Sequence, residues 1–290
     1  MTKRGLKRSN FRCERVRRPL EQFMSNEIER DFNLGGTVES ALSGQYELSV
    51  TKVFKEAWDC TIKHFFSFTP SIILLTILQV AIFFIALNLQ VYDVTGVFEQ
   101  FAKTGSIPAG FMQALYLANF SYEVVSAPFF AGVCLMAMSH AAGLKTKTRQ
   151  ITSGLQFTIT VIFVTLISLL LQGIANLLLP VVSLYLSLAF SNTVLLVCEK
   201  RVRPLNALLL SLRAVNRKIF QIAIIYAVLM GLFLAALMFY GVGLLFVLPF
   251  YFHVKGIIYR NMFGIRLKIV ATNQQNGDDD QNNNNQVFNA

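Results

Sequence analysis

The chain has 290 residues, of which 54% are hydrophobic and only 14% are charged, against roughly 25% charged residues in an ordinary soluble domain. This composition excludes an ordinary soluble globular protein. The formal net charge of +10 does not indicate nucleic-acid binding. The basic residues lie beside long apolar segments, where they usually report membrane orientation and attraction to anionic headgroups.

Two long stretches of the chain contain no Asp, Glu, Lys or Arg. The first runs from Gln150 to Cys198 and covers 49 residues, and the second runs from Ile219 to Val254 and covers 36 residues. A membrane-spanning helix needs only about 20 apolar residues to cross about 30 Å of hydrocarbon. Each stretch therefore fits two spans, which predicts an all-α, polytopic integral membrane protein.

The ends of the chain differ from its middle in composition. We expect a disordered basic arm over residues 1–45, a membrane domain over residues 46–268, and a disordered tail rich in Asn, Gln and Asp over residues 269–290. No apolar stretch follows the first basic residues, so the arm is not a secretory signal peptide. Met24 is as plausible a first residue as Met1.

About six spans and two amphipathic helices are predicted in the membrane domain. The spans are residues 67–89, 109–142, 157–179, 180–197, 219–240 and 242–259. The amphipathic helices are residues 48–66 and 204–218, and their apolar spacing and charges suit the inner membrane surface. Residues 93–106 read as a polar loop.

Proline and glycine interrupt several of these spans. Pro70 lies near the predicted start of the first span, where proline costs a helix little. The second span is too long for one straight crossing, so we expect either a kink at Pro128 or a helix that begins outside the membrane. Gly241 and Gly243 predict a hinge between the last two spans, and Pro249 is a candidate kink in the last one.

The distribution of basic residues predicts the orientation. Six spans place both termini on the same side of the membrane. Of the 26 Lys and Arg residues, only Lys103 falls in a loop on the opposite side. The positive-inside rule therefore predicts that both termini are cytoplasmic.

Glu123 is the first candidate functional residue, because a carboxylate within an apolar segment is costly and marks a functional site by default. Tyr116 and Tyr122 are its candidate local partners. The alternative is that Glu123 lies near the outer interface, since about 16 apolar residues separate it from His140 at the cytoplasmic end. Its depth decides between the two.

Other polar residues lie near the predicted cytoplasmic ends of spans. His140 and His253 titrate near neutral pH when unperturbed, although an interfacial histidine is more often only amphipathic. Lys255 and Arg260 are expected to extend toward the headgroups; a lipid-phosphate site with Arg201 and Arg203 is an alternative.

No enzyme motif was found. Cys13, Cys60, Cys134 and Cys198 lack the paired spacing of metal ligands, so free thiols are expected. The sequence contains no His-Glu-x-x-His, Gly-x-Ser-x-Gly or P-loop pattern. We therefore expect no catalytic residues, no bound metal and no cofactor.

Three stretches together resemble a known family. They are residues 126–133 with Pro128 and Gly132, residues 207–218 with Ser211 and Asn216, and residues 241–263 with Gly241, Gly243 and Pro249. They resemble uncharacterised bacterial six-helix membrane proteins, which are related to the membrane module fused to some glycerophosphodiester phosphodiesterases. The resemblance covers roughly residues 46–264, and it implies a six-helix fold in the bacterial plasma (inner) membrane.

Two functions remain open from the sequence. The first is a non-enzymatic inner-membrane protein that acts in envelope or lipid homeostasis, with membrane lipids and a membrane protein as partners. The second is a small transporter or a permease subunit of a transport system, for which the broken spans would form a midplane site with Glu123 as the coupling group. An intramembrane lipid enzyme that uses Glu123 or His140 is a third and weaker hypothesis.

Overall fold

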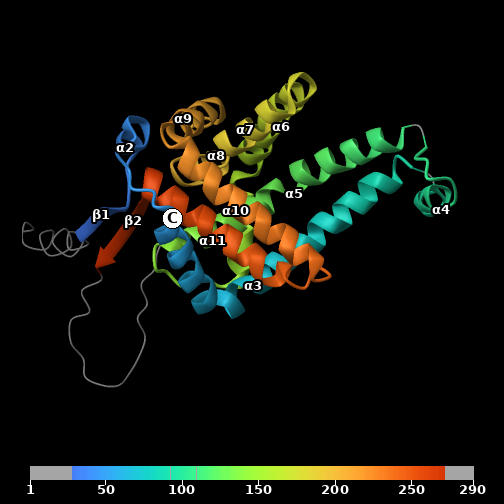
Figure 1. The fold of residues 1–290 in the computed structure, drawn as a ribbon. Coiled ribbons are helices and arrows are strands. Elements are labelled where there is room, and N and C mark those ends of the chain that lie inside the picture. The colour runs from blue at the N-terminus through green and yellow to red at the C-terminus, as the bar shows by residue number, and fades with distance from the viewer. Residues whose placement is uncertain (1–27, 92, 109, 272–290) are drawn as a thin grey trace, which may run out of the picture. The chain divides into compact units, whose positions relative to one another are not determined.

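The computed structural model describes residues 28–91, 93–108 and 110–271 (Figure 1). Helices form most of this part of the chain, and the predicted all-α membrane bundle is confirmed. The helices are α2 (Val38–Ser43), α3 (Val50–Asn88), α4 (Val94–Thr104), α5 (Phe111–Ala141), the 3-10 helix η1 (Thr148–Phe157), α6 (Thr158–Leu178), α7 (Pro180–Ala189), α8 (Thr193–Glu199), α9 (Pro204–Arg217), α10 (Ile219–Met238) and α11 (Leu244–Phe263).

The chain divides into two compact units. The first unit holds both chain ends. The part of it that the structure describes consists of most of strand β1 (Ile28–Leu34) and most of strand β2 (Ile265–Ala271), and these two strands pair with each other. The second unit is the helical domain, residues 33–265. β1 and α2 fall within the arm that was expected to be disordered, and β2 reaches into the expected tail. The disorder predicted for residues 1–27 and 272–290 lies outside the described residues.

Five helical segments of the described chain are long and apolar enough to cross a membrane. They are Val50–Asn88, Phe111–Ala141, Thr148–Leu178, Pro180–Glu199 and Ile219–Met238. The sixth predicted span corresponds to α11, which is 20 residues long but carries Lys255 and Arg260. Because α11 falls outside the five, its crossing stays a prediction. It packs against α3, α5 and α10, and it is buried along most of its C-terminal half.

The predicted amphipathic helix and the first span form a single helix. α3 continues for 39 residues, with Pro70 well inside it rather than near a start. α5 likewise continues through Pro128 for 31 residues. α3 and α5 run side by side toward α4, which connects their far ends (Figure 1). Each proline lacks a backbone N–H and therefore removes one hydrogen bond from its helix. The packing of the two long apolar helices against each other outweighs this local loss.

The segment that was predicted to be a polar loop contains the amphipathic helix α4. Asp93 is its N-cap: the carboxylate accepts hydrogen bonds from the Gly96 amide (2.9 Å) and the Thr95 hydroxyl (2.7 Å). Gly105 ends the helix in the left-handed conformation, with φ of 67°. The prediction missed this helix because polar residues around Asp93 and Gly105 suggest a loop, although the same residues are good helix caps.

The cap makes α4 sensitive to acid. The Thr95 hydroxyl and then the Gly96 amide hold the pKa of Asp93 below its usual range. The stabilisation is therefore complete above the unfolded pKa of about 3.9 and is lost as the pH falls through the lower, folded value. We expect hydrogen exchange of the α4 amides, corrected for intrinsic rates, to lose protection in that acidic range. The Asp93→Asn variant caps without titrating, so an identical acid response in that variant would contradict this prediction.

The second predicted amphipathic helix is confirmed as α9, and it is attached to the segment before α3. The Tyr46 hydroxyl donates to the Ala214 carbonyl (3.0 Å), Arg217 Nε donates to the Leu42 carbonyl (2.8 Å), and the Lys218 ammonium donates to the Tyr46 carbonyl. Burial raises the pKa of Tyr46 to about 12, so this phenol remains a donor throughout the physiological range.

Candidate functional site

A pocket of about 300 Å³ lies among the helices of the membrane domain. Residues of α3, α5, α6, α7, α8 and α11 line it, together with the turn between α7 and α8. The polar lining residues are Gln79, Tyr122, Glu123, Ser126, Thr165, Ser168, Gln172, Ser187, Ser191, Thr193 and Lys255. So many polar groups around one hollow are unusual for a membrane interior, because each polar group in hydrocarbon requires a partner or water.

The pocket contains one carboxylate and one ammonium. Glu123 belongs to α5, and its Oε1 accepts a hydrogen bond from Asn119 Nδ2 (3.1 Å). Lys255 belongs to α11 and is only 6% exposed, and its Nζ lies 4.7 Å from the centre of the Phe130 ring. Phe130 lies seven residues beyond Glu123 on α5, which is roughly 10 Å along the helix axis. The two charges therefore occupy different levels of the same pocket.

Lys255 does not lie as the sequence suggested. The prediction that it extends to the headgroups is wrong, because it is almost fully buried and lines the pocket. Glu123, by contrast, lines an interhelical pocket together with one of its predicted partners, Tyr122. Tyr116 is 66% exposed and is not among the residues that line the pocket.

The predicted fourth span is interrupted where it meets the pocket. α7 ends at Ala189 and α8 begins at Thr193, with a turn over residues 190–192. Thr193 is 2% exposed, lines the pocket, and its hydroxyl has no hydrogen-bond partner among the described residues. Irregular backbone at membrane depth is tolerated where protein covers it or where it lines a cavity, so this break fits a binding site.

All three histidines of the chain come together beside α3, α5 and α11. The His140 Nδ1 and His253 Nε2 atoms are 3.0 Å apart, and His64 stacks on His140 with ring centres 4.0 Å apart. The second ring nitrogen of His253 and of His140 lies beside a threonine hydroxyl: His253 Nδ1 lies 3.0 Å from Thr61 Oγ1, and His140 Nε2 lies 2.8 Å from Thr146 Oγ1. The histidines are therefore buried partners of one another rather than isolated interfacial residues.

The hydrogen-bond partner of the Thr61 hydroxyl fixes the direction of each hydrogen bond that His140 and His253 make. The Thr61 hydroxyl donates its one hydrogen to the Ala57 carbonyl (2.7 Å), so it must accept from His253 Nδ1–H. With both rings neutral, His253 Nε2 then accepts from His140 Nδ1–H, and His140 Nε2 accepts from the Thr146 hydroxyl. Every polar atom of the two rings is satisfied, which favours a structural role in joining three helices.

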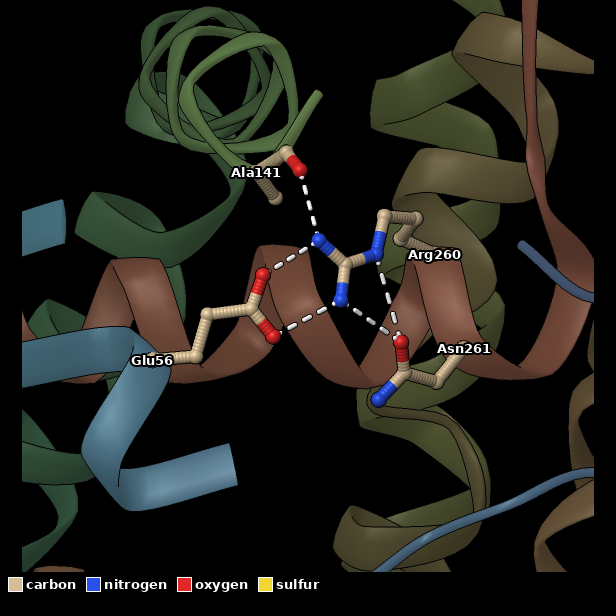
Figure 2. Close-up of polar contacts among 4 residues, drawn as sticks. All are labelled: Glu56, Ala141, Arg260 and Asn261. Carbon is tan, nitrogen blue, oxygen red and sulfur yellow. Dashed lines mark hydrogen bonds and ion pairs between the residues drawn. The ribbon is translucent and has the colours of Figure 1, made fainter. Parts of the chain in front are cut away.

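Arg260 joins the same three helices nearer the C-terminal end of α11 (Figure 2). Its guanidinium makes a two-point ion pair with Glu56 of α3, with Nη2 2.8 Å from Oε2, and donates from Nη1 to the Ala141 carbonyl of α5 (2.7 Å). It also donates to Asn261 Oδ1 at 2.9 and 3.2 Å. The expected extension of Arg260 to the headgroups is thus wrong: a planar fork with partners on each side fixes its position.

The glycine and proline candidates shape the scaffold rather than the pocket surface. A Cβ on Gly132 would lie 1.9 Å from the Ile151 carbonyl oxygen, and a Cβ on Gly154 would lie 2.0 Å from the Pro128 carbonyl oxygen. α5 and η1 therefore touch backbone to backbone at this point. Gly241 has a φ of 77°, Gly243 packs against Ala236, and Pro249 lies buried inside α11.

Within the described part of the chain, no group of three or more His, Cys, Asp or Glu side chains could hold a metal ion. Cys60, Cys134 and Cys198 are free thiols, and Cys13 lies outside the described residues. His140 and His253 use their ring nitrogens for hydrogen bonds with each other and with threonine hydroxyls. The arrangement can therefore bind and orient a polar molecule in the pocket, but it presents no recognisable nucleophile with its base.

The fold and the pocket define a multi-pass helical membrane protein with a charged interhelical pocket. Comparison with protein-family models, with curated proteins and with solved structures finds no match for this chain.

Proposed function

We propose that the protein binds a small polar molecule in the pocket and functions as a small transporter or as a membrane subunit of a transport system. The single observation that carries this proposal is that Glu123 and Lys255 line one pocket between helices. Charged side chains inside a membrane bundle usually mark the path or the binding site of a substrate. Envelope or lipid homeostasis without a transported substrate gives no reason for this pair.

The interrupted span supports the same proposal. Transporters commonly build their sites near the bilayer midplane from discontinuous helices. Here the break between α7 and α8 contributes Ser191 and Thr193 to the pocket. The pocket volume of about 300 Å³ is at the lower end of the usual range for small-molecule sites. A small solute or a single headgroup is thus a fitting occupant.

The proposed setting is the bacterial inner membrane, with six spans and both termini in the cytoplasm. The distribution of Lys and Arg residues supports this orientation, because Lys103 alone is assigned to an opposite-side loop. Membership of the bacterial six-helix family named above is part of the proposal. Membrane lipids and a membrane-protein partner are its proposed neighbours, and its role is non-enzymatic.

Access to the pocket from water tests the proposal. In a variant without the four native cysteines, Ser168→Cys would place a thiol in the pocket lining, whereas Val228→Cys would place one on an exposed, apolar surface in the middle of α10. A charged, membrane-impermeant methanethiosulfonate is added to right-side-out cells and to inverted vesicles. We expect Ser168→Cys to react from both sides and Val228→Cys to react from neither, because a thiolate does not form in hydrocarbon.

Labelling from neither, one or both sides of the membrane leads to different conclusions. If the pocket thiol is as inert as the Val228→Cys thiol from both sides, the pocket is closed to water and the proposed function is wrong. If it reacts from one side only, the pocket does not open to both sides of the membrane, and the transport part of the proposal is refuted. Reaction from each side supports a pathway through the protein.

A further inference from the structure

We propose that the molecule bound in this pocket carries an anionic group, which the Lys255 ammonium binds together with the hydroxyl of Thr193, another residue of the pocket lining. This inference rests on the proposed function, because that function assigns a ligand to the pocket. It adds the chemical class of the ligand: a small organic anion, such as a carboxylate or a phosphate monoester, or the phosphate headgroup of a lipid.

Lys255 lacks a counter-ion within the described part of the chain. The side chain is 6% exposed, and within the described residues its ammonium has neither an ion pair nor a hydrogen bond; its contact is the face of the Phe130 ring at 4.7 Å. Taking an unpaired ammonium out of water is costly, and a cation–π contact offsets only part of that cost. An anion in the pocket would supply the remainder.

Other buried or half-buried cations of the domain show what Lys255 lacks. The Lys200 ammonium lies 3.1 Å from a Glu199 carboxylate oxygen, and both of these side chains are less than 10% exposed. Arg260 pairs with Glu56, and Lys218 donates to the Tyr46 carbonyl. The protein thus gives its enclosed cations an acceptor from its own chain. Lys255 has no such acceptor among the described residues, and it lines the open pocket instead.

A second, independent observation points to the same ligand. Thr193 also lines this pocket, and its hydroxyl is buried and has no hydrogen-bond partner among the described residues. A buried hydroxyl without a partner is destabilising, and it can donate to an anion. The residue comes from α8, whereas Lys255 comes from α11, so two separate elements leave donors unused on the same cavity.

Glu123 limits which anions fit. Glu123 lines the same pocket and lies on α5 roughly 10 Å before Phe130 along the helix axis. A negative charge at that level would be repelled, whereas a neutral polar group or a cation would be accepted. The pocket therefore fits a molecule with its anionic group at the Lys255 level and no second negative charge near Glu123.

The Lys255→Met variant tests the inference, because methionine keeps much of the apolar stem of lysine without its charge. The full chain is purified in phosphatidylcholine nanodiscs, and unfolding is followed by the fluorescence of Trp58. Acetate, inorganic phosphate, glycerol 3-phosphate and γ-aminobutyrate are added at constant ionic strength. A second arm omits these probes and compares discs with and without phosphatidylglycerol. Lys103→Met, an exposed substitution in α4, is the matched control.

We expect at least one anionic probe or the anionic lipid to raise the melting midpoint of the wild-type chain and of Lys103→Met. The apparent affinity should fall about tenfold to a hundredfold in Lys255→Met, as for the loss of one charge-assisted hydrogen bond. A shift with free anions in phosphatidylcholine discs identifies a soluble ligand; a shift with phosphatidylglycerol alone identifies a lipid headgroup.

The inference is overturned if no probe and no lipid stabilises the wild-type chain, or if Lys255→Met responds as the wild type does. Either result leaves the proposed function standing wherever the pocket thiol still reacts from both sides. An inert pocket thiol, in contrast, removes the proposed function itself. The two failures are therefore distinguishable.

Discussion

Replacing Gly154 with alanine is expected to destabilise the folded protein by about 3 kcal/mol or more, the upper end of overpacking costs. The added Cβ would lie 2.0 Å from the Pro128 carbonyl oxygen and 2.5 Å from the Gly132 amide nitrogen. Both atoms belong to the backbone of α5, so no flexible side chain can move aside. Gly132→Ala should act in the same way, since its Cβ would lie 1.9 Å from the Ile151 carbonyl oxygen.

Gly231→Ala in α10 is the matched control, because nothing lies within 4 Å of a Cβ at that position. Alanine is a better helix former than glycine by about 1 kcal/mol, so this control should be neutral or slightly stabilised. The measurement is the free energy of unfolding in lipid bicelles, obtained by steric trapping. Equal stability of Gly154→Ala and Gly231→Ala would show that α5 and η1 do not meet backbone to backbone.

His253→Phe is expected to destabilise the protein by about 2–3 kcal/mol, although phenylalanine fills nearly the same volume. The substitution removes the hydrogen bond from His140 Nδ1–H and the hydrogen bond to Thr61 Oγ1. It thereby leaves one buried donor without an acceptor and one hydroxyl oxygen without a donor. Side-chain hydrogen bonds between membrane helices contribute about 0.6–1.7 kcal/mol each, and an orphaned buried group adds to this loss.

His64→Phe separates hydrogen bonding from aromatic packing in the same cluster. The His64 ring stacks on His140 at 4.0 Å with an interplanar angle of 8°, and phenylalanine preserves that stacking. Its unfolding free energy should change by less than about 1 kcal/mol when measured beside His253→Phe. If His64→Phe were as destabilising as His253→Phe, the hydrogen-bond directions derived for the cluster would be wrong.

The apolar helices were the most predictable part of the fold. The predicted spans 157–179 and 219–240 agree closely with α6 (Thr158–Leu178) and α10 (Ile219–Met238). Long uncharged runs determine such helices, because only a closed backbone hydrogen-bond pattern is tolerated in hydrocarbon. Turn residues determined their ends: Pro180 begins α7, and Gly241, with its positive φ, separates α10 from α11.

Elements that depend on tertiary packing were predicted less well. α3 continues through Pro70, and residues 38–43 form a short helix within the arm that was expected to be disordered. Neither follows from local composition. α3 is held against α5 and α11 along its length, whereas Tyr46 and Arg217 attach the end of the arm to α9. Contacts with residues more than 160 positions away cannot be read from a local pattern.

The candidate site was only partly predictable. Glu123 could be found from the sequence, because an acidic residue in an apolar segment is conspicuous. Lys255 was assigned to the membrane surface, because the sequence near it also contains Arg260 and suggests the end of a span. Its burial follows from the packing of α11 against Phe130 of α5. The histidines gave a usable signal, since His140 and His253 were both placed at the same end of their spans.

The central claim is that a charged pocket inside the helical bundle holds a polar molecule. An electron cryomicroscopy map of the full chain in native-lipid nanodiscs, with an antibody fragment as a fiducial, tests it most directly. We predict an open pocket between Glu123 and Lys255, with non-protein density in contact with the Lys255 ammonium. A collapsed pocket in which the Lys255 ammonium pairs with a carboxylate of the chain itself would contradict the account.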